Sequence, residues 1–362
     1  MERFTACFGE MPDPRAENVR HSLVDVLFIA LAAVLCGAES CTDMADFGAA
    51  KADFLAPILK LEHGAPSHDT FSRVFRLLDA EAFEAAFTRF TLAFSGALQG
   101  VVAIDGKALR GAYERGCKTT PLHLVNVWAV EAQVAVAQRL APGRNEVAGA
   151  LEAIALLNLD GCTVTADALH CRPDMAAAIL GQGGDFVLAL KKNRPKLLAH
   201  ASALLDAAAP DASAQTPPIF AHDRTEQRRA TVVAISQTAD FGGFDGVAAV
   251  ARVETNRQVE GQANTVITRH FLLSACLDPL HLLNIVRSHW GIENKLHWAL
   301  DVTLDEDRAR SRKDSAPQNL ATLRKIALNT LRSHPDKASL RRKIKRAGWD
   351  NLFLQSLLTH MR

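Results

Sequence analysis

Three carboxylates stand out because each lies in or directly after a segment with the pattern of regular structure. Asp105 ends the apolar run 101–104, and Asp167 ends the alternating run 162–166. Glu293 lies much later, within the sequence HWGIENKLHWALDV. Carboxylate oxygens are the ligands that Mg²⁺ or Mn²⁺ prefers, and two such ions held ~3.5–4 Å apart activate an attacking oxygen and stabilise a leaving one. The three acids are therefore candidate ligands of two divalent ions in phosphoryl transfer.

Two of these acids are predicted to come from strands and the third from a helix. We expect Asp105 to bridge both ions from a central strand and Asp167 to hold one ion from the adjacent strand. Val286, Trp290, Glu293 and His297 recur at intervals of three and four, which predicts a helix with Glu293 on its packed stripe. A carboxylate on a packed stripe needs a cation or a hydrogen-bond donor, so we expect Glu293 to hold the second ion.

The order of elements around the first two acids predicts the fold class. Strand-like runs and helical stretches follow one another as strands 101–104, 124–130 and 134–137, helix 146–157, strand 162–166, helix 173–180 and strand 185–190. Three consecutive strands, a helix and then strand, helix, strand is the order of an α/β protein with an RNase H-like mixed sheet and flanking helices.

The rest of the chain divides into segments that differ in periodicity and composition. Residues 20–95 have helical periodicity, residues 205–220 are rich in Ala, Pro and Ser and are predicted to be a loop, and the chain is helical again from Pro279. Strand-like runs at 229–236, 247–253 and 265–274 indicate a β-rich insertion. The predicted domains are a helical N-terminal domain 1–97 that could bind DNA ends, the first part of the catalytic core 98–205, the insertion 206–275, and the region 276–362 with the helix of Glu293 and a basic helical end.

Composition indicates a soluble globular protein. The chain has 362 residues, 48% of them hydrophobic and 22% charged, which suggests two or three domains. The apolar segment 23–38 falls short of the ~20 residues needed to span a bilayer, so a buried helix is predicted and no membrane association. It is also poorly placed for a secretion signal. The 7 cysteines form no C-x-x-C pair, which favours a reducing cytoplasm over a disulfide framework.

Positive charge is concentrated late in the chain. Residues 308–346 hold 13 Lys or Arg against 2 acids, although the whole chain carries a formal charge of +1. A polyanion such as nucleic acid is the natural partner of such a segment. We expect Arg341, Arg342 and Lys343, on a short helix ending at Gly348, to contact DNA phosphates. The acidic run 305–307 is predicted to be a solvated turn.

Several other polar residues have two interpretations. Lys107 and Arg110 follow the first acid and could hold the substrate phosphate beside the metals, or they could be plain surface charges. His170 could position a water or phosphate, or be a hydrogen-bonded structural histidine. The helix with Arg73 and Arg76 could contact DNA, or simply pack by its phenylalanines.

Four ordered motifs carry a family resemblance. The segments DGKALRG, TADALHCRPD, GGDFVLALKKNRPKL and RSHWGIENKLHWALDVTLDEDRAR together resemble the H-repeat-associated family of bacterial insertion-sequence DDE transposases. The N-terminal helical leader is also similar, so the likeness covers nearly the whole chain. The resemblance implies an RNase H-like core, a divalent cofactor and a DDE triad. Carried over by position, the triad is Asp105, Asp167 and Glu293, separated by 62 and 126 residues.

The resemblance also implies partners and a cellular place. Double-stranded DNA is the implied partner, as the inverted-repeat ends of a mobile element and as target DNA. A homo-oligomer is expected because two ends must be held together, in the cytoplasm and on the nucleoid when bound.

One motif departs from the wider class. The positions expected to hold Tyr, Arg and Lys of its signature are Val286, His289 and Leu300. Arg287 and Lys295 are close enough to make those phosphate contacts instead. His297 and Asp301 continue the face of Glu293 and could orient it from behind.

The leading functional hypothesis is a DNA transposase that nicks element ends and uses the freed 3′-hydroxyl to attack target DNA. A metal-dependent nuclease of the same fold, without strand joining, remains an alternative. An inactive element-derived repressor that binds DNA is another.

Overall fold

The computed structural model describes residues 2–15, 19–113, 120–209, 212–221, 223–235, 241–261 and 263–360. The chain divides into two compact units. Unit 1 comprises Met1–Ala97, Gly106–Leu156 and Glu293–Arg362, and unit 2 comprises Leu98–Asp105 and Leu157–Ile292. Strand β1 (Gly100–Tyr113) contributes to both, because its first residues belong to unit 2 and the remainder to unit 1.

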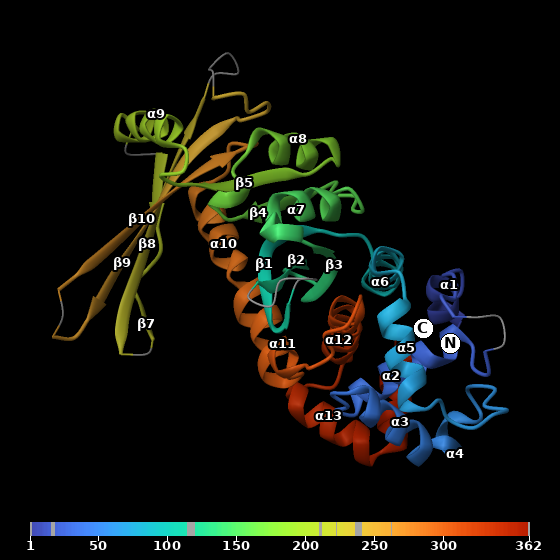
Figure 1. Ribbon diagram of the computed structural model, residues 1–362. Coiled ribbons are helices and arrows are strands. Elements are labelled where there is room, and N and C mark those ends of the chain that lie inside the picture. Colours follow the sequence, from blue (N-terminus) through green and yellow to red (C-terminus); the bar gives the residue numbers. More distant parts are fainter. Residues whose placement is uncertain are drawn as a thin grey trace. The chain divides into compact units, whose positions relative to one another are not determined.

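Unit 1 begins with helices. These are α1 (Glu2–Phe8), α2 (Leu23–Leu35), α3 (Cys41–Ala50), α4 (Ala52–Leu55), α5 (His68–Leu77) and α6 (Ala80–Ser95) (Figure 1). Local sequence sets where several of them start: Ser22 caps α2 and Asp79 caps α6 by accepting hydrogen bonds from backbone N–H groups. Ser40 and Asp43 form a capping box at α3. Helix α2 is buried along almost its whole length, which confirms the prediction of a buried helix over this apolar segment.

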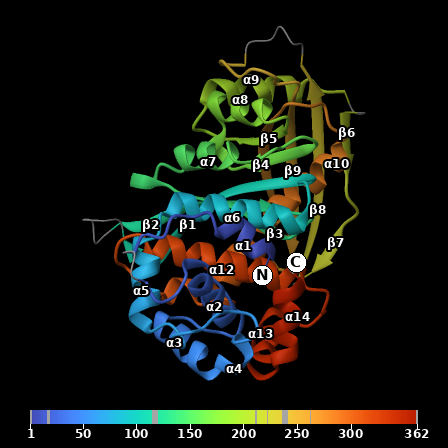
Figure 2. The same cartoon turned by 90° about the vertical axis from the view of Figure 1, so that its right-hand side faces the viewer.

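The last part of the chain supplies the centre of unit 1. It forms α11 (Trp298–Thr303), the short helix η5 (Glu306–Arg308), α12 (Ala316–Ser333), α13 (Leu340–Trp349) and α14 (Asn351–His360). Every residue of α12 from Ala316 to Leu331 is buried. The helix packs against α2, α5, α6 and α14, and Figure 2 shows α6 lying alongside it. A helix buried on all sides must satisfy its own polar side chains inside the protein.

The strands of unit 1 lie against α6 and α12. The part of β1 from Gly106 is followed by β2 (Pro121–Ala129), β3 (Val134–Leu140), the turn η1 (Pro142–Arg144) and α7 (Glu146–Ile154). Strands β2 and β3 pair antiparallel, and the order is β3, β2, β1. Asn329 of α12 donates to Ala135 O (2.7 Å) and accepts from Ala135 N–H (2.9 Å). It thereby covers the backbone of the edge strand β3, whose groups would otherwise be buried without partners.

A buried polar network joins these layers. Glu84 of α6 is fully buried and lies 2.7 Å from the guanidinium of Arg139. Its carboxylate also accepts hydrogen bonds from Gln138 (2.7 Å) and Gln318 (2.8 Å). Gln138 in turn accepts from the ammonium of Lys325, which is fully buried, at 2.6 Å. Burial lowers the pKa of Lys325 to about 8. The interior of unit 1 is therefore held by specific hydrogen bonds as well as by apolar packing.

Unit 2 is a mixed sheet with helices. Its elements are β4 (Cys162–Ala166), η2 (Ala168–His170), α8 (Pro173–Gly181), β5 (Asp185–Leu190), α9 (Pro195–Asp206), β6 (Ser213–Gln215), β7 (Ile219–Ala221), β8 (Arg224–Ala234), β9 (Ala249–Val259), β10 (Thr265–Leu273) and α10 (Pro279–His289). The strand order is β1, β4, β5, β10, β9, β8, β6, and β7 also pairs with β8. Strands β1, β4 and β5 are parallel neighbours, and the others are antiparallel. Figure 1 shows α9 against the long antiparallel strands.

The predicted fold class is confirmed: the protein is α/β, with a mixed RNase H-like sheet and flanking helices. The β-rich insertion is confirmed as a set of antiparallel strands, and β10 pairs with β5, so it extends the sheet of the core. Two details of the prediction were wrong. Residues 205–220 are not one loop, because they contain β6 and β7, and helix α9 was not predicted. Among the described residues, no helix combines the length and apolar character needed to cross a bilayer.

Candidate active site

Asp105 and Asp167 lie at the same edge of the unit 2 sheet. Ile104 of β1 is paired in register with Ala166 of the parallel strand β4, and each aspartate is the next residue. Parallel neighbouring strands lie ~4.8 Å apart, so the two aspartates occupy adjacent positions. Asp167 directly follows the end of β4, whereas Asp105 lies within β1, which continues to Tyr113 and does not end where the sequence predicted. Both aspartates are half-buried. Asp167 also caps η2, because its carboxylate accepts a hydrogen bond from Leu169 N–H at 2.8 Å, which fixes its orientation.

His289 is a further candidate site residue. In the sequence it was noted only as the position where the signature of the wider class has an arginine. It ends α10, and its Nδ1 lies 3.0 Å from the hydroxyl of Thr165, two residues before Asp167. Burial lowers the pKa of His289 to about 4, although the nearby carboxylate of Asp167 acts in the opposite direction. The imidazole is therefore neutral at neutral pH. Its position four residues before Glu293 in a helical segment is the signal that points to it.

Glu293 belongs to unit 1 and lies on a π-helical turn, η4 (Ile292–His297). π-helical turns interrupt α-helices and occur often at functional sites. Glu293 is exposed, whereas Ile292 and Leu296 of the same turn are fully buried. The prediction that Glu293 shares a packed stripe with Trp290 was wrong, because Trp290 is 47% exposed. The wider π turn shifts the helical phase and turns the carboxylate to solvent.

His297 and Asp301 lie in unit 1 with Lys107. The Nε2 of His297 lies 3.3 Å from the side-chain amide of Asn126. Burial lowers the pKa of His297 to about 3, and the neighbouring cations of Lys107 and Lys325 lower it further. Asp301 is bound to the ammonium of Lys107 at 2.7 Å. This ion pair ties Asp301 to a cation of β1.

Lys107 is a buried structural cation in this arrangement. Its Nζ lies 3.3 Å from Glu306 and 3.5 Å from Asp307, in addition to Asp301. Burial by itself lowers the pKa of Lys107, but the three carboxylates outweigh it and raise the pKa. The prediction of a solvated turn at residues 305–307 was wrong, because Glu306 is only 2% exposed. An ammonium neutralised by three carboxylates is poorly placed to hold a substrate phosphate.

The remaining predicted DNA contacts fall into two groups. Arg110, Arg287, Lys295, Arg341 and Arg342 are exposed. Lys343, by contrast, is buried and donates to the backbone oxygens of Leu331 (2.6 Å) and His334 (3.0 Å), where it caps the end of α12. The expectation that Lys343 contacts DNA therefore conflicts with its position. His170 is also buried, on η2 beside Asp167, as expected of a structural histidine.

Within unit 1, Gly106 lies beside an acid that the sequence did not single out. Glu146 lies 2.8 Å from the Nε2 of His123. A side chain added at Gly106, the residue after Asp105, would lie 2.4 Å from the carboxylate of Glu146. The glycine thus leaves space for an acid–imidazole pair within unit 1.

The carboxylates suit a hard divalent ion by their chemistry. Two half-buried aspartates at one strand edge supply oxygen ligands of the kind that Mg²⁺ and Mn²⁺ prefer. Within the described part of the chain, no group of three or more His, Cys, Asp or Glu side chains is close enough to hold a metal ion. The pair Asp105 and Asp167 is thus brought together within unit 2, and Glu293 is carried by unit 1.

Sequence comparisons define the class of protein. Residues 96–330 match the family described as Transposase DDE domain, and residues 5–91 match the family described as DDE_Tnp_1-associated. The protein YbfL of Escherichia coli (strain K12) is 30% identical over 360 residues, which cover 96% of this chain and 95% of YbfL. The H repeat-associated protein YhhI of the same strain is 29% identical with the same coverage.

This chain is also similar to a further protein and to a solved structure. A Xanthobacter autotrophicus protein encoded in the dhlA 3′ region is 37% identical over 281 residues, covering 75% of this chain and 94% of that protein. A cryo-EM structure of a piggyBac transposase synaptic complex with hairpin DNA gives a TM-score of 0.47 at 12% identity, covering 98% of this chain and 77% of that one. The chain belongs to the DDE transposase-domain family and, within it, to the H repeat-associated transposases.

Proposed function

We propose that this transposase-family protein cleaves phosphodiester bonds at the ends of an insertion sequence and joins the freed 3′ ends to target DNA. The observation that supports the proposal is that Asp105 of β1 and Asp167, which follows β4, come directly after a residue pair in register on two parallel strands. Glu293 is proposed as the third member of the triad, on its π-helical turn. The substrate is double-stranded DNA in the bacterial cytoplasm, at the nucleoid.

The proposed roles follow from each side chain's surroundings. Asp105 and Asp167 would hold a pair of Mg²⁺ or Mn²⁺ ions together with Glu293. When bound, such ions lower the pKa of an attacking water or hydroxyl and neutralise charge on the phosphodiester. The Leu169 N–H holds the carboxylate of Asp167 in one orientation. His289, neutral and bound to Thr165, adds a hydrogen-bonding group beside Asp167 without adding positive charge.

Exposed cations are proposed to handle the DNA. Arg110, Arg287 and Lys295 lie within a few residues of the triad in sequence and are exposed, so they are available to phosphate groups near the site. A homo-oligomer is proposed because two element ends must be joined in one reaction.

The test is an incubation of the full chain with end-bearing DNA, Mg²⁺ and a circular target. The transposase proposal predicts both nicked ends and products in which ends are covalently joined to the target. Cleavage without joined products would instead establish the nuclease alternative. Specific binding of end DNA without cleavage would establish the element-derived repressor.

A further inference from the structure

A hollow lined by cations lies in unit 1 between α5 and the segment 309–316 that leads into α12. It consists of two depressions, of about 340 and 360 Å³, that share Ser72 and Arg76. The first is also lined by Arg73 and by one acid, Asp69, both of α5. The second is also lined by Arg310, Arg312 and Lys313. We call this hollow the α5 groove.

Three cations of the α5 groove are uncommitted. Arg73, Arg310 and Lys313 are exposed, and the described residues provide no hydrogen bond or ion pair to their charged groups. The other two are anchored: Arg76 pairs with Asp314 at 2.8 Å, and Arg312 donates to Gly111 O at 2.7 Å. The anchored arginines shape the groove. The three uncommitted cations outnumber Asp69, the acid that also lines it, so the groove keeps a net positive charge.

The walls of the α5 groove are fixed by buried contacts. The side-chain amide of Asn319, which is fully buried, donates to Phe75 O and Leu78 O, both at 2.9 Å, and so joins α12 to the end of α5. The backbone N–H of Ser315 donates to Arg76 O at 3.3 Å. Both walls are therefore held at a defined separation, which favours binding because little order must be created when a ligand arrives.

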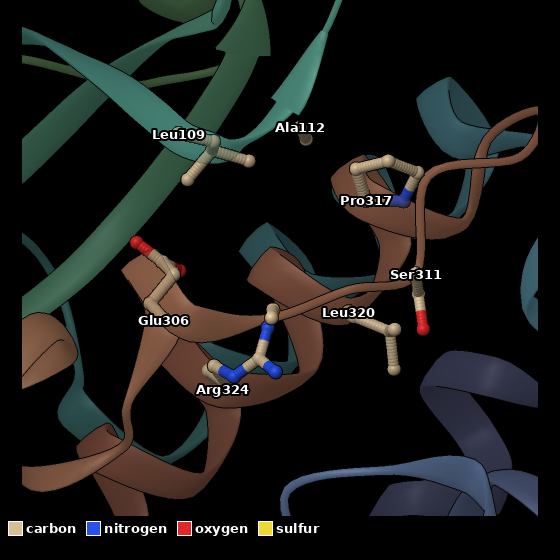
Figure 3. A pocket seen from close by; sticks show the side chains of 8 residues that line it. Leu109, Ala112, Glu306, Ser311, Pro317, Leu320 and Arg324 are labelled. Atoms are coloured by element: carbon tan, nitrogen blue, oxygen red, sulfur yellow. The ribbon is translucent and has the colours of Figure 1, made fainter.

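The inner side of the segment 309–316 rests on a nearly filled interior. Figure 3 shows the small cavity beneath it, where Leu109 of β1 faces Leu320 and Arg324 of α12, with Glu306 alongside. This cavity measures about 10 Å³, room for about one water molecule. The segment is thus supported from below, and its cationic side chains are left on the solvent side.

Several cations of the basic helix α13, unlike the uncommitted cations of the α5 groove, are bound to groups within the protein. Lys343 is buried, and Arg341 donates to Val302 O at 2.8 Å. Arg346 pairs with Asp336 at 3.1 Å and lies over the ring of Phe353 at 4.2 Å. Much of the charge that is dense in sequence here serves the fold.

We infer that the α5 groove binds the phosphodiester backbone of duplex DNA, which rests on the proposal that this chain acts on DNA. Arg73, Arg310 and Lys313 pair with phosphates, and the hydroxyls of Ser72 and Ser311 supply further donors. Contacts of this kind hold the duplex in one orientation without reading its sequence. The groove is open and its free cations are exposed, which suits a continuous polyanion.

The test compares two triple variants of the full chain with equal loss of charge. One replaces the uncommitted groove cations (R73Q, R310Q, K313Q). The other replaces exposed cations of α13, the helix on which the sequence predicts DNA contacts (R341Q, R342Q, K345Q). Binding to a fluorescent duplex of arbitrary sequence is measured by anisotropy over a series of salt concentrations, in EDTA so that the triad plays no part. Thermal unfolding of each variant checks that the fold is retained, as expected for exposed side chains.

The inference predicts that the groove variant binds at least about tenfold more weakly at ~0.1 M salt, and that its slope of log K against log salt falls by about 2 to 3. The α13 variant is expected to lose less affinity than the groove variant, and its slope is expected to fall less. Equal behaviour of the groove variant and the wild type would overturn the inference, as would a larger loss in the α13 variant. A wild-type chain that binds no duplex even at low salt would instead refute the proposed function.

Discussion

Replacing Lys107 tests whether this residue is a structural cation or a DNA contact. Its side chain is 6% exposed, and its Nζ lies 2.7 Å from Asp301 and 3.3 Å from Glu306. The substitution Lys107→Met removes the charge while keeping a long side chain. Glu306, whose side chain is 1% exposed, then retains its negative charge with less compensation.

The magnitude follows from what remains around Glu306. Removing one partner of a buried ion pair costs about 3–5 kcal/mol. Lys325 and Arg324 also lower the pKa of Glu306 and stay in place, so we expect the lower end, about 3 kcal/mol. The loss also depends on pH. In the wild type, the cations outweigh burial and lower the pKa of Glu306, so its contribution is present above the ordinary pKa and is lost as the pH falls. The difference between variant and wild type is therefore larger at pH 7 than at pH 4.

Urea unfolding followed by tryptophan fluorescence measures this loss, because Trp128 is fully buried in unit 1 whereas Trp290, Trp298 and Trp349 are already exposed in the folded chain. Arg110→Met is the matched control, because that side chain is 83% exposed and only 3.5 Å from Asp307 at the surface. It is expected to cost less than about 1 kcal/mol. An unchanged unfolding free energy for Lys107→Met, together with weaker DNA binding, would refute the structural role of Lys107.

Two further predictions concern unit 1. The pKa of His297 is lowered to about 3 in the folded protein, so the unfolded chain takes up a proton first as the pH falls below about 6.5, and stability is lost. Urea unfolding should show that His297→Gln reduces the loss between pH 7 and pH 5 by about 2 kcal/mol, and an unaltered pH dependence would contradict this. A side chain at Gly111 would lie 2.4 Å from the backbone oxygen of Ala309, whereas the atoms nearest to one at Gly106 belong to the side-chain carboxyl group of Glu146. Gly111→Ala should therefore lower the free energy of unfolding by about 1–3 kcal/mol more than Gly106→Ala does. Thermal unfolding should show this as the lower midpoint, and the reverse order would show that β1 adjusts freely.

The sequence predicted those elements whose pattern is contained in a few neighbouring residues. Strand β4 and strand β5 are apolar or alternating runs bounded by turn residues, and the structure gives them the predicted bounds. The extension of β1 beyond Asp105 was not predicted, because Lys107 and Arg110 resemble loop residues. Strands β6 and β7 are short and depend on pairing with β8. Their sequences carry little strand signal of their own.

The candidate site was likewise predicted only in part. The sequence placed Asp105 and Asp167 beside each other on neighbouring strands, and the parallel register of β1 and β4 agrees with this, although β1 does not end at Asp105. The burial of Lys107 was not predicted, because its partner Asp301 is 194 residues away in sequence. Charge density along the chain pointed to α13, but it does not tell which side chains turn inward, and Lys343 turns inward to cap α12.

The central claim is that Asp105, Asp167 and Glu293 act together in breaking and joining DNA strands. The most direct measurement follows cleavage and joining of end-bearing DNA with Mg²⁺ by Asp105→Asn, Asp167→Asn and Glu293→Gln, with DNA binding measured in parallel. Asparagine also caps helices, so Asp167→Asn should preserve the turn at η2. We expect each variant to bind DNA as the wild type does and to yield no cleaved or joined product. Cleavage at the wild-type rate by any one of the three variants would contradict it.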